Sequence, residues 1–372
     1  MNQDTEQIRL QRENNLDSVF QGNRRQFFNA AAVAAAAGLI WPRHLLAEES
    51  ELLSDKFGTL LPTRPFGKTG KRITILGIGG QHYRRLESAD CQPAIEQSIE
   101  GGVRFFDTAN NYGNNQLSER LYGQHLTPKY REQIFLMTKS AARDAAGAKD
   151  HLDRSLKNLN TDVIDLWQVH DLNTIEDVDR RWDNGAIDVF IKAREEGKVR
   201  YIGITGHKQP EVLLHMISKF KERGIPLQSA QFPVNVCDPA FSSFIEKVIP
   251  VCLENDIAVL AMKTMCGGRL FGGIGEGWGP RGQIDTKPVI PEFLSFIEAT
   301  DFVWSLPITT RIAGFDNLAQ LKENIEAARK VTAVSTERKK KILSAAKDHS
   351  GPDREYYKRN VLALDDPRER NF

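Results

Sequence analysis

The feature that most constrains the fold is a regular alternation of strand and helix patterns that begins after residue 65. Eight short apolar runs read as buried strands, at residues 73–78, 103–106, 134–138, 163–169, 201–205, 229–232, 257–261 and 310–313. Helical patterns fill the gaps, for example at 91–101, 149–159, 186–197, 211–221, 243–254 and 317–331. Strands that alternate with helices pair in parallel through right-handed crossovers, and eight of them close a (β/α)8 TIM barrel.

A doubly wound open sheet is the competing architecture, and it needs a Gly-x-Gly-x-x-Gly turn after an early strand. The nearest segment, 76–80, does not match this motif, and no helix start follows it closely. We therefore expect a barrel over residues 65–335, followed by a C-terminal helix and a charged tail at 336–372. The tail is dense in charge and proline from residue 350, so we expect it to wrap the surface or to be disordered.

Residues 1–47 have the pattern of an export signal. A polar leader precedes the basic pair Arg24-Arg25 and two phenylalanines, and an Ala-rich apolar run at 30–41 leads to a small residue, Ala47. The pattern resembles a twin-arginine signal peptide, which predicts recognition by the twin-arginine export machinery and a periplasmic location.

Other interpretations of this leader remain open. An amphipathic surface helix is one, whereas a membrane span is disfavoured because the apolar run is shorter than the roughly 20 residues required. The leader is either removed after Ala47 or retained as an anchor. Residues 48–64 are then a linker to the barrel.

Composition excludes several classes of partner and site. The chain of 372 residues has 27% charged residues and a formal net charge of +1, so no electrostatic case exists for nucleic acid or an anionic membrane. The four cysteines, at 91, 237, 252 and 266, show neither a CxxC pair nor zinc-like spacing with histidine. We therefore predict no metal site, and buried free thiols in preference to disulfides.

Four polar residues fall at or just beyond the ends of three successive predicted strands. Asp107 and Tyr112 follow the second strand, Lys139 ends the third and His170 follows the fourth. Neighbouring parallel strands lie about 4.8 Å apart, so side chains at their carboxyl ends can converge. The carboxyl end is also where barrel enzymes keep their chemistry.

Together these four residues can form a proton donor that faces a polarised carbonyl. A phenol with a pKa near 10 is a poor acid, and we expect the Lys139 ammonium to lower the pKa of Tyr112. Asp107 is the expected counter-charge for Lys139. His170 is expected to hold the carbonyl oxygen toward Tyr112. Structural alternatives exist for each: a turn cap, a half-buried aromatic ring, and solvent-facing polar groups at strand ends.

The segment 101–123 carries Asp-Thr-Ala-x-x-Tyr-Gly, then Ser118-Glu119 and Gly123, and it resembles the aldo-keto reductase family. The resemblance extends over nearly all of residues 65–331. It implies the (β/α) barrel, NADPH or NADH bound without a Rossmann motif, and carbonyl reduction or its reverse. Hydride then passes from the nicotinamide, while the tyrosine supplies the proton. The catalytic tetrad implied by the family is Asp107, Tyr112, Lys139 and His170.

Further positions resemble the family's cofactor site. Thr205 and Gln231 match positions that bind the nicotinamide carboxamide, but Gly206 replaces a family amide, so one hydrogen bond must come from elsewhere. Met262 stands where a tyrosine usually stacks on the nicotinamide, and Lys263 can meet the pyrophosphate as a point charge. A buried methionine and a surface lysine are the structural alternatives.

The segment 313–324 resembles the adenosine end of the cofactor site. Its positions that align with cofactor contacts are Gly314, Gln320, Glu323 and Asn324. Asp316 falls near the place where NADPH-preferring members carry a basic residue, so its carboxylate suggests a preference for NADH. A helix N-cap at Asp316 or Asn317 explains the same residues equally well.

The sequence thus predicts an exported aldo-keto reductase that acts on small-molecule aldehydes or ketones, sugar carbonyls included. Gly206 and Met262 keep open a catalytically idle dinucleotide-binding sensor or accessory protein, since the periplasm offers no nicotinamide recycling. A barrel hydrolase or sugar-binding protein is a third interpretation, but no second carboxylate stands as convincingly at a strand end. The long Gly-rich connection at 267–282 is expected to be a working loop or flap beside the pocket.

Overall fold

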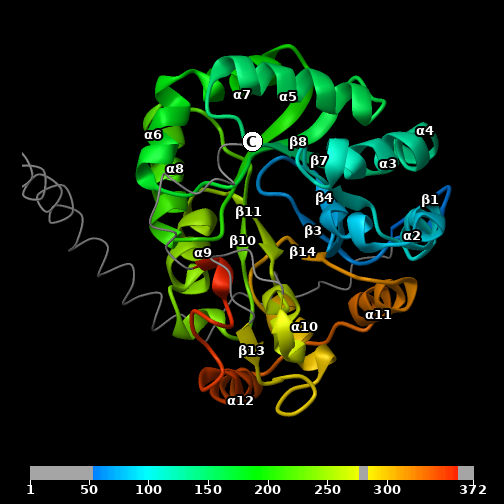
Figure 1. Cartoon of the computed structure of the whole chain (residues 1–372), viewed down its shortest axis with the longest axis vertical. Helices are drawn as coiled ribbons and strands as arrows, with labels where there is room; N and C mark the ends of the chain where they lie inside the picture. Colours follow the sequence, from blue (N-terminus) through cyan, green and yellow to red (C-terminus); the bar gives the residue numbers. More distant parts are fainter. Residues whose placement is uncertain (1–52, 276–283, 359–372) are drawn as a thin grey trace, which may run out of the picture. The chain divides into compact units, whose positions relative to one another are not determined.

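The computed structural model describes residues 53–275 and 284–358. Its centre is a closed barrel of parallel strands in the order β10-β11-β14-β5-β6-β7-β8-β9 (Figure 1). These strands are β5 Leu76–Gly79, β6 Phe105–Asp107, β7 Phe135–Ser140, β8 Ile164–Val169, β9 Val199–Thr205, β10 Ser229–Pro233, β11 Ala258–Met262 and β14 Thr310–Ala313. The predicted (β/α)8 barrel is confirmed.

Helices lie outside the ring of strands and cover it (Figure 1). They are α2 Ser88–Glu100, α3 Leu117–His125, α4 Thr127–Tyr130, α5 Ala145–Asn158, α6 Ile175–Asp183, α7 Ala186–Glu195, α8 Pro210–Glu222, α9 Phe244–Glu254, α10 Phe296–Trp304, α11 Leu318–Arg329 and α12 Thr336–Lys347. Each of the six helices expected from the sequence overlaps one of these. Several begin with a side-chain cap, such as Asn317 of α11, whose Oδ1 accepts from the Gln320 backbone N–H.

The first predicted strand, 73–78, is in fact divided into two. Residues Arg72–Thr74 form β4, which pairs antiparallel with β3 Thr63–Pro65, and only the following residues enter the barrel as β5. The β3–β4 hairpin carries Phe66 and Ile73 into the main apolar cluster, which also holds Phe105, Met137, Leu166, Ala258, Leu260 and Ile312. Because two of these residues, Phe105 and Ala258, begin β6 and β11, the hairpin closes the amino end of the barrel and leaves the carboxyl end for the site.

The described part of the expected linker is ordered. It forms β1 Ser54–Asp55 and β2 Gly58–Thr59, and the Asp55 carboxylate is paired with Arg104 at 2.7 Å. The leader at 1–47 lies outside the described residues. Within 53–275 and 284–358, no helix has both the length and the apolar character required to cross a bilayer. The four cysteines are free and buried, as predicted.

The long connection after β11 begins as a 3-10 segment, Cys266–Phe271. It continues as strand β12 Gly273–Gly275, which pairs antiparallel with β13 Ile284–Thr286. Residues 276–283 between the two strands lie outside the described part of the chain. The connection therefore leads to a two-stranded ribbon between β11 and α10.

The described part of the C-terminal tail differs from the expectation of a surface wrap or a disordered tail, while residues 359–372 lie outside the described residues. Residues 351–358 fold back, and Arg354, Glu355 and Lys358 are almost completely buried. The Lys358 ammonium is paired with Asp238 at 2.6 Å and with Glu355 at 2.9 Å, and Asp238 lies shortly before α9 in the chain. Opposite charges that neutralise one another allow a charge-rich segment to be buried.

Candidate active site

The four tetrad candidates lie together at the carboxyl end of the barrel. Asp107 is the last residue of β6, and Lys139 is the penultimate residue of β7. His170 directly follows β8, and its backbone N–H donates to the Ser140 carbonyl oxygen at 2.8 Å, which holds the end of β8 beside β7. Tyr112 reaches the group from the loop after β6. Parallel pairing of β6, β7 and β8 therefore brings the four side chains to one edge.

Lys139 is the centre of this group and is only 1% exposed. Its ammonium forms an ion pair with Asp107, donates to the Thr108 carbonyl oxygen at 2.8 Å and donates to the Tyr112 hydroxyl oxygen at 3.1 Å. An ammonium has three hydrogens, so these three acceptors satisfy it completely. The lysine thus has one fixed position, and it fixes the phenol.

The expectation that Lys139 lowers the pKa of Tyr112 is wrong for this structure. Burial raises the pKa of Tyr112 well above its usual value of 10, and the charges of Asp107 and Asp171 raise it further. The Asp107 carboxylate, which is ion-paired with Lys139, offsets the ammonium's effect on the phenol. Burial also lowers the pKa of Lys139 itself, which Asp107 opposes. The phenol is therefore protonated at neutral pH.

His170 lies against the phenol in a perpendicular arrangement. The two ring centroids are 5.7 Å apart with an interplanar angle of 76°. Burial lowers the pKa of His170 well below 6.5, and the nearby Lys139 charge lowers it further, so the imidazole is neutral at pH 7. Its Nδ1 has no hydrogen-bond partner among the described residues. A neutral imidazole and a protonated phenol, both able to donate, suit the recognition of one oxygen atom.

Thr205, the last residue of β9, and Gln231, the middle residue of β10, lie side by side because the strand register pairs them directly. Each is 2% exposed, and the Gln231 Oε1 is buried without a hydrogen-bond partner among the described residues. A buried acceptor of this kind is costly unless a donor satisfies it. The pair therefore fits an amide group such as the nicotinamide carboxamide.

Met262 is the last residue of β11 and pairs with Pro233 of β10, Lys263 follows it, and both are half-buried. Lys263 has a left-handed backbone, with φ of 54°. Burial lowers the pKa of Lys263 to about 8, although the Asp171 charge opposes this. The alternative of an ordinary surface lysine is therefore not supported.

The four residues expected at the adenosine end differ in their surroundings. Gly314 and Gln320 are exposed, and a Cβ at Gly314 would overlap the His82 ring. Glu323 is exposed on α11. Asn324 is buried and its side chain is engaged, because its Oδ1 accepts from Arg311 at 2.7 Å and its Nδ2 donates to the Gln320 carbonyl oxygen at 2.8 Å. Asn324 therefore holds Arg311 in place.

Asp316 is not the helix N-cap, because Asn317 fills that position. The Asp316 carboxylate instead lies 3.0 Å from the Arg85 guanidinium and 3.8 Å from His82 Nδ1. These two partners outweigh partial burial and lower the pKa of Asp316 to about 2. The carboxylate is therefore ionised at the edge of the expected adenosine site, beside an arginine.

Sequence reasoning missed two polar residues at this edge, Asp171 and His207, and one buried arginine in the barrel wall, Arg311. Asp171 and His207 directly follow His170 and Gly206, and their side chains meet at 3.2 Å between the Asp171 Oδ1 and the His207 Nδ1. Arg311 is buried inside the last strand, β14. The sequence feature that could have indicated Asp171 and His207 is that polar residues continue beyond the ends of β8 and β9, in His170-Asp171 and Gly206-His207.

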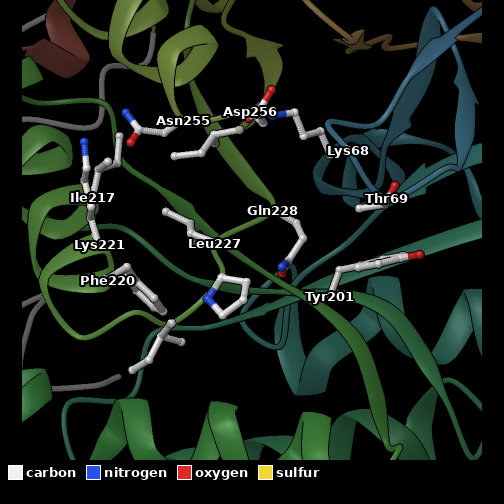
Figure 2. Close-up of a pocket in the computed structure, with 13 residues that line it drawn as sticks. Lys68, Thr69, Tyr201, Ile217, Phe220, Lys221, Leu227, Gln228, Asn255 and Asp256 are labelled. Atoms are coloured by element: carbon white, nitrogen blue, oxygen red, sulfur yellow. Dashed lines mark ion pairs between the residues drawn. The ribbon is translucent and has the colours of Figure 1, made fainter.

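A hollow lies at the opposite end of the barrel. Its volume is about 540 Å³, and Figure 2 shows that Tyr201, Gln228 and Asp256 are among its lining residues. These residues stand at the starts of β9, β10 and β11, far from the tetrad at the strand ends. The hollow therefore belongs to the amino end and has no part in the tetrad's chemistry.

Comparison with known proteins identifies the family. The model of the aldo/keto reductase family matches residues 75–283. The chain belongs to the aldo/keto reductase family. As the family and its oxidoreductase relatives imply, it is an NAD(P)H-dependent enzyme that reduces carbonyl compounds, with NADPH or NADH as cofactor. The alternative of a catalytically idle sensor is not favoured.

Two relatives and one solved structure show the extent of the similarity. The aldo-keto reductase YhdN of Bacillus subtilis is 27% identical over 240 residues, which cover 60% of this chain and 68% of that protein. The L-glyceraldehyde 3-phosphate reductase of Escherichia coli K12 is 25% identical, over 55% of this chain and 62% of that protein. The fold matches the holo form of aldo-keto reductase AKR11C1 from Bacillus halodurans, with a TM-score of 0.63 and 23% identity, covering 79% of this chain and 99% of that chain.

Proposed function

We propose that Tyr112 is the proton donor in carbonyl reduction by this enzyme and that His170 orients the carbonyl oxygen toward it. The observation that carries this proposal is the donation from Lys139 Nζ to the Tyr112 hydroxyl oxygen at 3.1 Å. Because the oxygen already accepts from Lys139, the phenol's own hydrogen points elsewhere and is available to a substrate. Asp107 keeps the buried Lys139 charged.

Residues of β9, β10 and β11 and the residue after β11 would hold the nicotinamide half of the cofactor. Thr205 and Gln231 would bind its carboxamide, Met262 would lie against its ring and Lys263 would bind its pyrophosphate. When bound, the reduced nicotinamide supplies the hydride. The orphaned Gln231 Oε1 supports this assignment, because an amide N–H is the donor that it lacks.

We further propose that the substrate is a hydroxylated aldehyde or ketone, such as a sugar carbonyl. The L-glyceraldehyde 3-phosphate reductase relative acts, by its name, on a hydroxylated aldehyde. Small aldehydes with and without hydroxyl groups, tested by loss of the absorbance of reduced nicotinamide, would define the substrate class.

The substitution Tyr112→Phe tests the proton donor. It removes one oxygen atom and keeps the ring, so we expect reductase turnover to fall by at least about 100-fold, while the dissociation constant of the dinucleotide stays nearly unchanged. Fluorescence titration measures the binding, and the rate of cofactor oxidation measures the turnover. Unaltered turnover in this variant would exclude Tyr112 as the proton donor.

We also propose that the enzyme is exported through the twin-arginine pathway to the periplasm. The leader supports this through Arg24-Arg25, the two phenylalanines and the apolar run at 30–41. Replacing both arginines by lysine should block export, as judged by cell fractionation, with the full leader retained on the protein. The N-terminal sequence of the exported protein would show whether cleavage follows Ala47. Export that is indifferent to both arginines would rule out this pathway.

A further inference from the structure

Asp171 combines an unusual backbone with a position next to the tetrad. Its φ is 54°, in the left-handed region that residues other than glycine rarely adopt, although aspartate tolerates it better than most. The backbone is held on both sides: Leu172 N–H donates to the Thr205 carbonyl oxygen at 3.0 Å, and the Arg181 guanidinium donates to the Asp171 carbonyl oxygen at 3.3 Å. Such strain, when the surroundings enforce it, often marks a functional position.

The Asp171 carboxylate is only partly satisfied by the protein. Asn173 Nδ2 donates to its Oδ2 at 3.4 Å, and His207 Nδ1 lies 3.2 Å from its Oδ1. The Oδ1 nevertheless makes no hydrogen bond of good geometry with the described residues. The side chain is 35% exposed although its Oδ1 is buried, so a ligand can approach the carboxylate from the Oδ2 side. An ionised carboxylate has about four acceptor sites, and several of them are open here.

Cations already lie near this carboxylate. Burial raises the pKa of Asp171, but His207, His170, Lys208 and Arg181 together outweigh burial and lower it to about 2. Burial lowers the pKa of His207 to about 4, so the charged neighbours at neutral pH are Lys208 and Arg181. The Asp171 charge also acts on Lys263, because it opposes the lowering of the Lys263 pKa by burial. A cationic ligand group would be repelled by the positive charges that already lie near the carboxylate. A neutral hydroxyl donor meets the open acceptor sites without that repulsion.

The carboxylate also acts on the reacting groups. Its charge is one of the causes that raise the pKa of Tyr112, and it affects the pKa of the adjacent His170. Asp171 also directly follows His170 beyond the carboxyl end of β8, so a substrate held between Tyr112 and His170 would lie beside this residue.

We propose that Asp171 accepts a hydrogen bond from a substrate hydroxyl group near the carbonyl that is reduced, and that it thereby selects hydroxylated aldehydes and ketones. This inference rests on the proposed function, because the hydroxyl is placed relative to a carbonyl held by Tyr112 and His170. A substrate without the hydroxyl displaces water from the carboxylate but offers it no hydrogen-bond donor in place of that water. Such a substrate is therefore reduced with a lower kcat/KM.

The test compares glyceraldehyde with propanal, which has the same carbon chain without hydroxyl groups. Asp171→Asn keeps the shape and tolerates the left-handed backbone, but it removes the charge that strengthens the hydrogen bond. We expect the ratio of kcat/KM for glyceraldehyde to that for propanal to fall roughly tenfold or more in this variant. Asp188→Asn, at an exposed position on α7, is the matched control and should leave the ratio unchanged.

The outcomes separate this inference from the function on which it rests. An unchanged ratio in Asp171→Asn, with an active wild-type enzyme, would overturn the role of Asp171 alone. An equal change in both substrates, accompanied by weaker dinucleotide binding in fluorescence titration, would also overturn it, because Asp171 would then serve the cofactor. A wild-type enzyme that reduces neither aldehyde nor any other carbonyl would overturn the proposed function, and this inference with it.

Discussion

The ammonium nitrogen of Lys139 lies 3.1 Å from the hydroxyl oxygen of Tyr112 and donates to it. This direction of donation decides what the phenol can do, because its oxygen accepts from the lysine and its hydrogen remains free. The lysine also lies 4.6 Å from the centroid of the Tyr112 ring, so it holds the ring as well as the oxygen. In this structure Lys139 therefore positions a proton donor, while burial keeps the donor protonated.

Replacing Lys139 by methionine should reduce both stability and activity. The change leaves the buried Asp107 carboxylate without its partner, and breaking a buried ion pair on one side costs about 3–5 kcal/mol. Reductase turnover should fall by at least about 100-fold, because the phenol loses its orientation. Urea denaturation measures the first effect, and cofactor oxidation with a carbonyl substrate measures the second.

The double variant Asp107→Asn with Lys139→Met separates the two effects. It removes the uncompensated charge, so most of the lost unfolding free energy should return, whereas turnover should stay low. If turnover recovers together with stability, Lys139 acts only as a structural partner of Asp107.

The pH dependence of reduction should reveal the protonation state of Tyr112. Since burial, Asp107 and Asp171 raise the pKa of Tyr112 well above 10, the proton donor is retained through neutral and mildly alkaline pH. We expect kcat/KM for propanal to show no loss from this group up to about pH 10. Asp171→Asn removes one negative charge that raises this pKa, so its alkaline decline should begin at lower pH. A decline at the same pH in both proteins would show that Asp171 does not act on the phenol.

Much of the fold was predictable because the strand signal is local. Apolar runs such as 163–169 and 229–232 need only their own composition to be recognised, and their number fixes a closed barrel. The convergence of Asp107, Lys139 and His170 follows from that topology alone, since parallel strands end at one edge. The division of 73–78 into β4 and β5 was not predictable from apolar content, which is continuous through both strands.

Other parts of the site depend on contacts that a sequence pattern does not contain. Asp171 contacts His207 and has a left-handed backbone, and no motif signals that conformation. The sign of the pKa shift of Tyr112 is set first by burial and then by the charges of Asp107 and Asp171, which depend on the packing and distances of the fold. The buried charges near the C-terminus look like a solvated tail until their partner, Asp238, is placed beside them.

Dinucleotide preference should depend on the pair formed by Asp316 and Arg85. The Asp316 carboxylate is ionised and lies at the expected adenosine end, so we expect wild-type enzyme to bind NADH more tightly than NADPH. Asp316→Ala removes the repulsion and releases Arg85, whose guanidinium suits a phosphate, so affinity for NADPH should rise about tenfold relative to NADH. Fluorescence titration with both dinucleotides measures this. Tighter binding of NADPH by the wild type would refute the preference.

Lys358 should be essential to stability although it lies far from the tetrad in sequence. Its ammonium is fully buried between Asp238 and Glu355 and donates to the Phe241 carbonyl oxygen at 2.7 Å. In Lys358→Met two buried carboxylates face each other without a cation, and we expect the unfolding free energy to fall by about 3–5 kcal/mol. Lys322→Met, at a position 70% exposed, is the control and should change it by less than about 0.5 kcal/mol.

The loss in Lys358→Met should also depend on pH, with a sign fixed by Glu355. Burial raises the pKa of Glu355 and the Lys358 charge lowers it, so removing the lysine raises it further. A carboxyl group with a raised pKa in the folded state destabilises the fold at high pH, and this penalty disappears as pH falls through the folded pKa. The variant should therefore be closest to wild type at about pH 5 and furthest from it at about pH 8 in urea denaturation. A difference that is constant between these pH values would show that lost packing of the lysine stem, and not the unpaired carboxylates, causes the destabilisation.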